Sequence, residues 1–149
     1  MKVPDDTVSN VMIFDRDPEV IDLLYRLLSK NGFQVTTETD WHRAIELGRT
    51  NRFAVVLAEC NLQDLDGLFL LKSIAEKNPT IQVILMTGAT LPERVMSAYT
   101  LGVSGYLFKP FTNLNEVLHT VHMAVYRYQR WISALRRAQS QNESVSGAV

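Results

Sequence analysis

The sequence predicts an α/β protein built on a parallel sheet. Three observations lead to this prediction: short apolar runs alternate with stretches of helical apolar spacing, five such pairs follow one another, and their connections are short. A continuous apolar run of a few residues is typical of a strand buried on both faces, whereas apolar residues recurring every three or four positions are typical of a helix with one buried face. Strands that alternate with helices run parallel, so we expect helices on both faces of the sheet.

Five segments are predicted as strands. They are residues 11–14, 33–37, 53–58, 81–86 and 105–108. The first and third are uninterrupted apolar runs, and the fourth is interrupted only by one glutamine, which is typical of strands inside a parallel sheet.

The predicted helices begin and end at recognisable residues. Asp17 caps the first helix and Pro18 suits its first position, while the Asn31-Gly32 pair ends it because glycine tolerates the left-handed backbone. Asp40 is expected to open the second helix in the same way as Asp17.

The later helices are predicted from their spacing. The loop 61–67 leads to a third helix that closes near residue 78. Thr90 and Glu93 have the spacing of a capping box, which predicts a fourth helix from there to about Gly102. Asn113 and Glu116 repeat this spacing at the start of a long last helix.

Composition and length narrow the class of protein. The 149 residues suit one domain, and 46% hydrophobic with 21% charged residues excludes wholesale disorder. A net charge of −1 gives no basic field for indiscriminate binding of nucleic acid. The single cysteine, Cys60, excludes a disulfide framework. We expect residues 1–10 to be an N-terminal arm. They carry two aspartates and no apolar stretch, and no run is long enough to span a membrane, so we expect no signal peptide and a cytoplasmic protein.

Polar and charged residues follow the predicted strands and point to a site. In a parallel sheet of this kind, ligands bind at the carboxyl ends of the strands. The residues found there are Asp15, Arg16, Glu59, Thr87 and Lys109. Carboxylates beside a hydroxyl and an ammonium form a set suited to phosphoryl chemistry, although no glycine-rich phosphate loop is present.

Four segments in chain order match a known pattern. They are residues 14–18, 57–67, 86–88 and 102–111. In this combination the sequence resembles the receiver domain of bacterial two-component response regulators, the CheY-like superfamily, from about Val11 to Val125. The resemblance implies the flavodoxin-like (βα)5 fold, a doubly wound sheet in the order 2-1-3-4-5, a role in phosphorelay signalling rather than catalysis, and a cis bond before Pro110.

Three residues fit the family pattern. The resemblance implies that Thr87 and Tyr106 act as switch residues and that Lys109 contacts the phosphoryl group. Taken alone, each residue has a plainer interpretation: Thr87 as a turn residue, Tyr106 as a half-buried edge residue and Lys109 as a surface lysine.

Two residues depart from the pattern. The family has an aspartate that accepts the phosphoryl group where this chain has Glu59, and an acidic pair that holds Mg²⁺ where this chain has Asp15-Arg16. Arg16 removes an oxygen ligand and adds repulsion, which disfavours Mg²⁺ and leaves no metal or other cofactor expected. We expect Arg16 to pair with Asp15 and to bridge it to Glu59, with Lys109 completing the neutralisation.

The sequence therefore predicts an atypical pseudo-receiver that acts through protein–protein interaction. Its partner would be a sensor histidine kinase or a downstream effector protein. Glu59, one methylene longer than aspartate, either mimics the phosphorylated state or only fills the position. Two alternatives remain open: a phosphorylation-competent receiver with a modified site, and a flavodoxin-like enzyme that binds a ligand.

The last helix carries a separate signal. Apolar residues continue at spacings of three and four to its end, and we expect the second half, residues 126–139, to project beyond residues 11–125 and residues 140–149 to be a disordered tail. The projecting residues are Tyr128, Trp131, Ile132 and Leu135. They predict a homodimer through this helix, or otherwise through the face of the fourth helix, last strand and last helix. Direct binding of nucleic acid is not favoured, because the arginine cluster is small.

Overall fold

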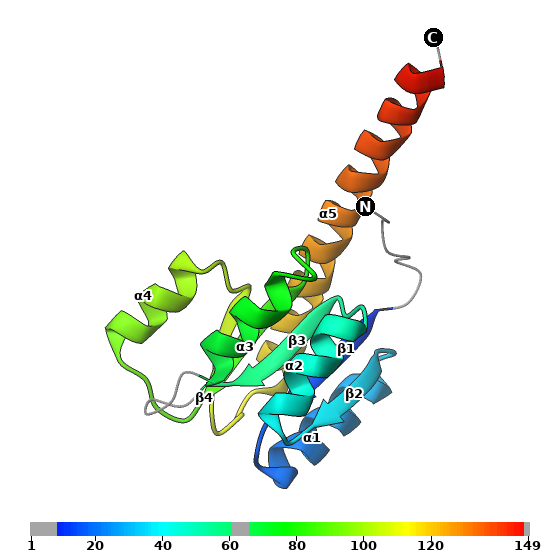
Figure 1. Cartoon of the computed structure of the whole chain (residues 1–149). Helices are drawn as coiled ribbons and strands as arrows, with labels where there is room; N and C mark the ends of the chain where they lie inside the picture. Colours follow the sequence, from blue (N-terminus) through cyan, green and yellow to red (C-terminus); the bar gives the residue numbers. More distant parts are fainter. Residues whose placement is uncertain (1–8, 61–65, 148–149) are drawn as a thin grey trace.

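The computed structural model describes residues 9–60 and 66–147. Within these residues a five-stranded parallel sheet has the order β2-β1-β3-β4-β5 (Figure 1). The strands are β1 (Asn10–Phe14), β2 (Gln34–Glu38), β3 (Val55–Glu59), β4 (Gln82–Thr87) and β5 (Gly105–Phe108). The predicted fold class and strand order are confirmed.

Helices cover both faces of this sheet. They are α1 (Pro18–Lys30), α2 (Trp41–Thr50), α3 (Asp66–Ala75), α4 (Pro92–Thr100) and α5 (Leu114–Gly147). Alternate residues of each strand point to opposite faces: Val11 and Ile13 of β1 pack with α1 and α5, whereas Met12 and Phe14 pack with α2, α3 and α4. No helix among the described residues is both long enough and apolar enough to cross a membrane.

Side-chain caps place the first two helices as predicted. The Asp17 carboxylate accepts a hydrogen bond from the Glu19 amide, and the Asp40 carboxylate accepts one from the His42 amide. Gly32 follows α1 with a φ of 90°, where a side chain would be strained. These contacts fix where the chain turns after β1 and β2.

The predicted capping box at the start of α4 is wrong. The cap residue is Leu91, with extended backbone and no side-chain hydrogen bond, whereas the helix end at Thr100, capped by Leu101, agrees with the predicted end at about Gly102. The residue before a proline is driven out of the helical region, so Pro92 moves the helix start past Thr90. The Asn113 cap is confirmed, because its side-chain oxygen accepts hydrogen bonds from the amides of residues 115 and 116.

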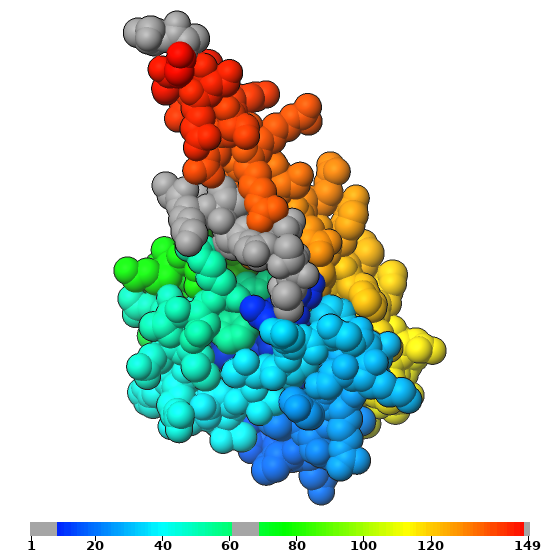
Figure 2. Space-filling model, turned by 90° about the vertical axis from the view of Figure 1, so that its right-hand side faces the viewer, coloured from blue at the N-terminus to red at the C-terminus, as the bar shows by residue number. Residues whose placement is uncertain are grey.

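The last helix is longer than predicted. α5 continues to Gly147, so residues 140–147, expected to be disordered, are helical. Residues 140–146 contain neither glycine nor proline, so nothing in the chain stops the helix before Gly147. At 1.5 Å per residue the helix is roughly 51 Å long, and its end stands clear of the sheet and the other helices (Figures 1 and 2). Residues 1–8 and 148–149, the rest of the expected arm and tail, lie outside the described residues.

The apolar stripe of α5 belongs mainly to the core. Tyr128 is 6% exposed and Ile132 is fully buried, and Leu135 packs against the same cluster, so the expectation that these residues project is wrong for the first two. They lie seven residues after Val121 and Val125, on the face that already covers the sheet. Leu135 is half-buried, and Trp131, 57% exposed, has the predicted exposure.

Close packing of α2 on α3 gives a test of this arrangement. A Cβ atom at Gly48 would collide with the side chain of Ile74, which is fully buried. Gly48→Ala should lower the free energy of unfolding by about 1–3 kcal/mol in a urea titration, because overpacking forces a core side chain to move.

The matched control is Gly88→Ala, where an added Cβ meets nothing within 4 Å and the backbone φ is not in the left-handed region. In the double variant with Ile74→Val, part of the loss should return because the obstructing methyl group is gone. Equal stability of the Gly48→Ala and Gly88→Ala proteins would contradict the close contact.

Candidate functional site

Three strands bring charged residues to one edge of the sheet. β1 is followed by Asp15, β3 ends at Glu59, and β5 is followed by Lys109. Because β1 and β3 are paired with Phe14 opposite Ala58, the two carboxylates come side by side. The Lys109 amide donates to the Thr87 carbonyl at 2.7 Å, which continues the pairing of β5 with β4 past the strand end. The bond between Lys109 and Pro110 is cis, as the resemblance implies.

Asp15 is the buried charge of the site. Its side chain is fully buried, and its Oδ2 atom lies 2.6 Å from the Lys109 Nζ atom. Its Oδ1 atom accepts a hydrogen bond from the Asp17 amide at 2.9 Å. Burial raises the pKa of Asp15 above its ordinary 3.8, and the bonds from Lys109 and from the Asp17 amide oppose that rise. The predicted partner of Asp15 was Arg16, whereas the ion pair described here is formed by Lys109.

Glu59 lies between two cations. Its Oε2 atom accepts from Arg16 twice, from the Nε atom at 3.0 Å and from the backbone amide at 3.1 Å. Its Oε1 atom lies 3.8 Å from the Lys109 Nζ atom. Within the part of the chain that the structure describes, the cation within 4 Å of both carboxylates is Lys109, and Arg16 contacts Glu59 from the more exposed side. Among the described residues, two carboxylates and two cations are in contact at this edge.

Thr87 at the end of β4 and Tyr106 in β5 do not contact this charged cluster through the hydrogen bonds described here, and each has another partner. Thr87 is buried, and its hydroxyl donates to the Ala89 carbonyl at 2.7 Å. The Tyr106 hydroxyl is 3.1 Å from the Thr90 hydroxyl, and its ring stacks on Phe108 with centroids 5.5 Å apart. Burial raises the pKa of Tyr106. The structure thus brings both residues to the correct edge, with each hydroxyl bonded to the segment between β4 and α4.

One neighbour of the site was missed by the sequence reasoning. The Arg94 guanidinium of α4 lies 3.8 Å from the sulfur of Cys60, the residue after Glu59. Cys60 is buried. Arg94 is one of several arginines on predicted helix surfaces, and no local signal distinguishes it.

The charged side chains at this edge offer few free oxygen ligands for a metal ion, because cationic nitrogens already contact them. In residues 9–60 and 66–147, no three histidine, cysteine, aspartate or glutamate side chains lie close enough together to hold a metal ion. Both carboxylates already accept from cations, and the residue beside Asp15 presents a guanidinium rather than an oxygen.

A five-stranded parallel sheet in this order, with an acid–lysine pair at its carboxyl edge, defines a receiver-type α/β domain. Comparison with known proteins agrees: residues 11–122 match the response regulator receiver domain family, and the chain belongs to that family.

Similar proteins are bacterial regulators. The chain is 32% identical over 117 residues to the DNA-binding transcriptional regulator NtrC of Klebsiella pneumoniae. This match covers 78% of this chain and 25% of that protein. It is 30% identical over 118 residues to the probable transcriptional regulatory protein TcrX of Mycobacterium tuberculosis, which covers 79% of this chain and 50% of that protein. The chain thus spans a quarter to a half of the length of these relatives.

Solved structures share the fold. A CheY-like receiver domain protein from Methanospirillum hungatei JF-1 superposes with a TM-score of 0.76 at 20% identity, covering 83% of this chain and 98% of that one. A two-component response regulator from Clostridium difficile gives 0.69 at 27% identity, covering 80% and 96%. The first of these likenesses concerns the fold alone.

The raised pKa of Asp15 predicts a pH dependence of stability. A carboxyl with a higher pKa in the folded state binds its proton more tightly there, so its contribution to the free energy of unfolding is greatest below pH 3.8 and falls as the pH rises through the folded pKa. The unfolding free energy of the wild type minus that of Asp15→Asn should therefore decrease as the pH rises above 3.8.

Urea titrations of the two proteins across a pH series measure this difference. Asp22→Asn, which removes an exposed carboxylate on α1, controls for the loss of a charge. A difference between the wild type and Asp15→Asn that stays flat or grows with pH would contradict the assignment.

Proposed function

We propose that this receiver domain signals by protein–protein interaction from a pocket that its own side chains neutralise, without Mg²⁺-dependent phosphorylation of an aspartate. The observation that carries the proposal is the position of Glu59 between Arg16 and Lys109. The resemblance places the phosphoacceptor at this position. Here it is a carboxylate whose two oxygens both face cations.

The residues present do not fit Mg²⁺. This ion prefers oxygen ligands in near-octahedral geometry and keeps several waters. Asp15 and Glu59 offer carboxylate oxygens, but Lys109 and Arg16 already lie against them at 2.6 and 3.0 Å. A divalent ion beside them would add like-charge repulsion of about 4 kcal/mol per unit-charge pair at 4 Å, at a dielectric constant of about 20.

The contacts of Glu59 support a domain that stays in one signalling state and does not cycle between a phosphorylated and an unphosphorylated state. Its carboxylate makes contacts to a lysine and an arginine of the kind that a phosphoryl group makes, with less charge and two oxygens instead of three. We propose that the domain holds one conformation at this site, set by those ion pairs. A phosphorylation-competent site remains the alternative that the test below separates.

The surface around α4 and β5 supports the proposal that the domain signals by protein–protein interaction. Met96 and Tyr99 of α4 are 61% and 77% exposed, and Phe108 of β5 is 56% exposed. Large apolar side chains this accessible on neighbouring elements are typical of a surface that binds another protein. We propose this face as the docking site for a sensor kinase, an effector or a second copy, in a non-enzymatic protein of the cytoplasm.

The absence of phosphorylation can be tested directly. The wild type incubated with acetyl phosphate and Mg²⁺ should gain no mass in intact-protein mass spectrometry, because no acceptor aspartate or metal site is formed. A Mg²⁺-dependent gain of one phosphoryl group, mapped to Glu59 or Asp15, would contradict the proposal.

The matched control restores the family residues. The double variant Arg16→Asp with Glu59→Asp should gain one phosphoryl group at position 59 under the same conditions. Each single variant should gain less, since one still carries the guanidinium and the other still carries the longer acid. This control shows that the reagents and the fold support the reaction.

The docking face predicts self-association or partner binding that depends on α4. Met96→Ser with Tyr99→Ser should lower the average mass measured by light scattering at high concentration, because the exposed apolar area is removed. Tyr25→Ser, on α1 and 47% exposed, is the control. A wild type that is monomeric at every concentration would refute the homodimer, and an unchanged dimer in the α4 variant would place the interface elsewhere.

A further inference from the structure

A groove lies at the amino ends of the strands, opposite the charged site. It holds about 480 Å³ between the turns that precede β4 and β5 and the outer half of α5. Its lining residues are Pro79, Thr80, Ile81, Gln82, Gly102, Arg127, Trp131 and Leu135. Trp131 is 57% exposed and Leu135 is half-buried, so large apolar side chains on this side of α5 remain accessible from solvent.

A row of arginines continues from this groove around α5. Each residue of a helix is rotated by about 100° from the one before, so Arg127, Arg130 and Arg137 fall within about 80° of one another and span roughly 15 Å along the axis. Trp131 lies between this arginine row and the buried stripe of the helix. All three arginines are exposed, and none has a carboxylate within 4 Å in residues 9–60 and 66–147.

The charge of this surface has one sign. Between residues 117 and 142, α5 has four arginines and neither aspartate nor glutamate. No acidic side chain of the described chain lines the groove. Complementary charges favour association, so the occupant that suits this surface carries carboxylates beside large apolar side chains.

Two other occupants suit the surface less well. A second copy that docked its own α5 here would bring arginines against arginines, and like charges oppose association. A nucleic acid would pair its phosphates with the arginines, but its bases would meet Pro79, Ile81 and Leu135, whose side chains form no hydrogen bonds. Trp131 is the one aromatic residue in the lining, whereas surfaces that bind single strands stack successive bases on several.

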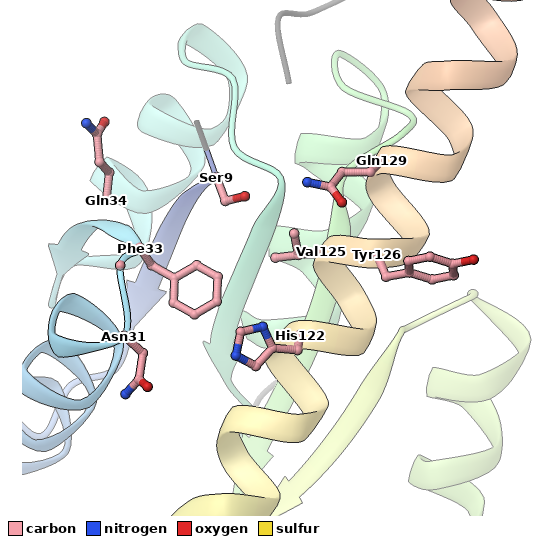
Figure 3. Close-up of a pocket in the computed structure, with 9 residues that line it drawn as sticks. Ser9, Asn31, Phe33, Gln34, His122, Val125, Tyr126 and Gln129 are labelled. Atoms are coloured by element: carbon pink, nitrogen blue, oxygen red, sulfur yellow. The ribbon is translucent and has the colours of Figure 1, made fainter. Parts of the chain in front are cut away.

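The opposite flank of α5 has no such charge. The hollow there is lined by Ser9, Asn31, Gly32, Phe33, Gln34, His122, Val125, Tyr126 and Gln129, which include no lysine, arginine, aspartate or glutamate. Figure 3 shows the rings of Phe33 and His122 facing one another in this hollow, with centroids 5.2 Å apart. Gln129 is exposed and labelled in the same view, which makes it a position where charge can be changed away from the groove.

We propose that the groove and the arginine row bind a short amphipathic, acidic segment of another protein. Apolar side chains of that segment lie against Trp131 and Leu135, and its carboxylates pair with the arginine row. The partner then holds the outer half of α5 and leaves both the charged site and the α4–β5 face uncovered. The proposal does not depend on the state of Glu59, because the groove and the charged site lie at opposite ends of the strands.

The probe is a fluorescein-labelled synthetic helix of about four turns, with leucines along one side and glutamates along the other. Fluorescence anisotropy with the full-length protein should show saturable binding of this peptide. A peptide with lysine in place of every glutamate, and one with serine in place of every leucine, should each bind at least about tenfold more weakly, because each lacks one half of the match. The chain has two tryptophans, so in the Trp41→Phe background the acidic peptide should move the emission of Trp131 to shorter wavelength.

Variants of the full-length protein locate the site. Arg127→Gln and Trp131→Ser should each weaken binding of the acidic peptide about tenfold, because arginine and tryptophan at the centre of an interface carry much of its binding energy. One matched control is Gln129→Glu, which lowers the net charge by one as Arg127→Gln does but lines the other hollow. The other is Tyr25→Ser on α1, where the side chain is 47% exposed. Both controls should leave Kd within about twofold, and circular dichroism checks that each variant is folded.

Several results would overturn the proposal. One is an acidic peptide that does not bind at millimolar concentration, and another is an equal loss in the Arg127→Gln and Gln129→Glu proteins. A thymidine oligonucleotide that displaces the labelled peptide as well as the unlabelled peptide does would make the surface a site for nucleic acid. Trp131 emission that shifts with protein concentration in the absence of peptide would assign the groove to a second copy instead. None of these readings involves phosphorylation or Mg²⁺, so they are independent of the test of the charged site.

Discussion

The Lys109 ammonium lies 2.6 Å from a carboxylate that is fully buried, and the arrangement of the site depends on this pair. A buried carboxylate without a partner costs several kcal/mol. Asp15 must therefore be met by a cation, and the cation comes from the far end of the domain sequence, after β5. The pair fixes the end of β5 against the end of β1 across two intervening strands.

Glu59 and Arg16 complete the balance. With Asp15 and Lys109 they form two carboxylates and two cations whose contacts lie between 2.6 and 3.8 Å. An acidic site of the usual receiver type holds unbalanced negative charge, and a divalent ion relieves it. Here the Arg16 guanidinium, which stands where the family has an acid, neutralises part of that negative charge, and its planar donors bind a carboxylate well. We propose that the site therefore needs no metal to be stable in its folded form.

Much of the fold could be predicted because its signals are local. The apolar runs that became β1, β3 and β4, and the aspartates that cap α1 and α2, act through neighbours in sequence. The predicted start of α4 failed because a proline outweighed a plausible cap. The end of α5 failed because a polar stretch without glycine or proline suits an exposed helix as well as it suits disorder.

The site and the last helix show the limit of sequence spacing. Periodicity placed Tyr128 and Ile132 on one stripe with Leu135, but it does not say whether a stripe faces the protein's own core or a partner, and the core takes the first two. Likewise, the strand ends predicted which charges meet, whereas the choice of Lys109 rather than Arg16 as the partner of Asp15 depends on side-chain reach across the sheet. Such distances arise only in three dimensions.

The most direct test of the balanced site is a Mg²⁺ titration followed by amide NMR shifts. The account predicts that the amides of Arg16, Glu59 and Lys109 do not move at millimolar Mg²⁺, because both carboxylates already accept from cations. Saturable shifts centred on these three residues would show that the ion displaces Arg16 or Lys109, and would contradict the account.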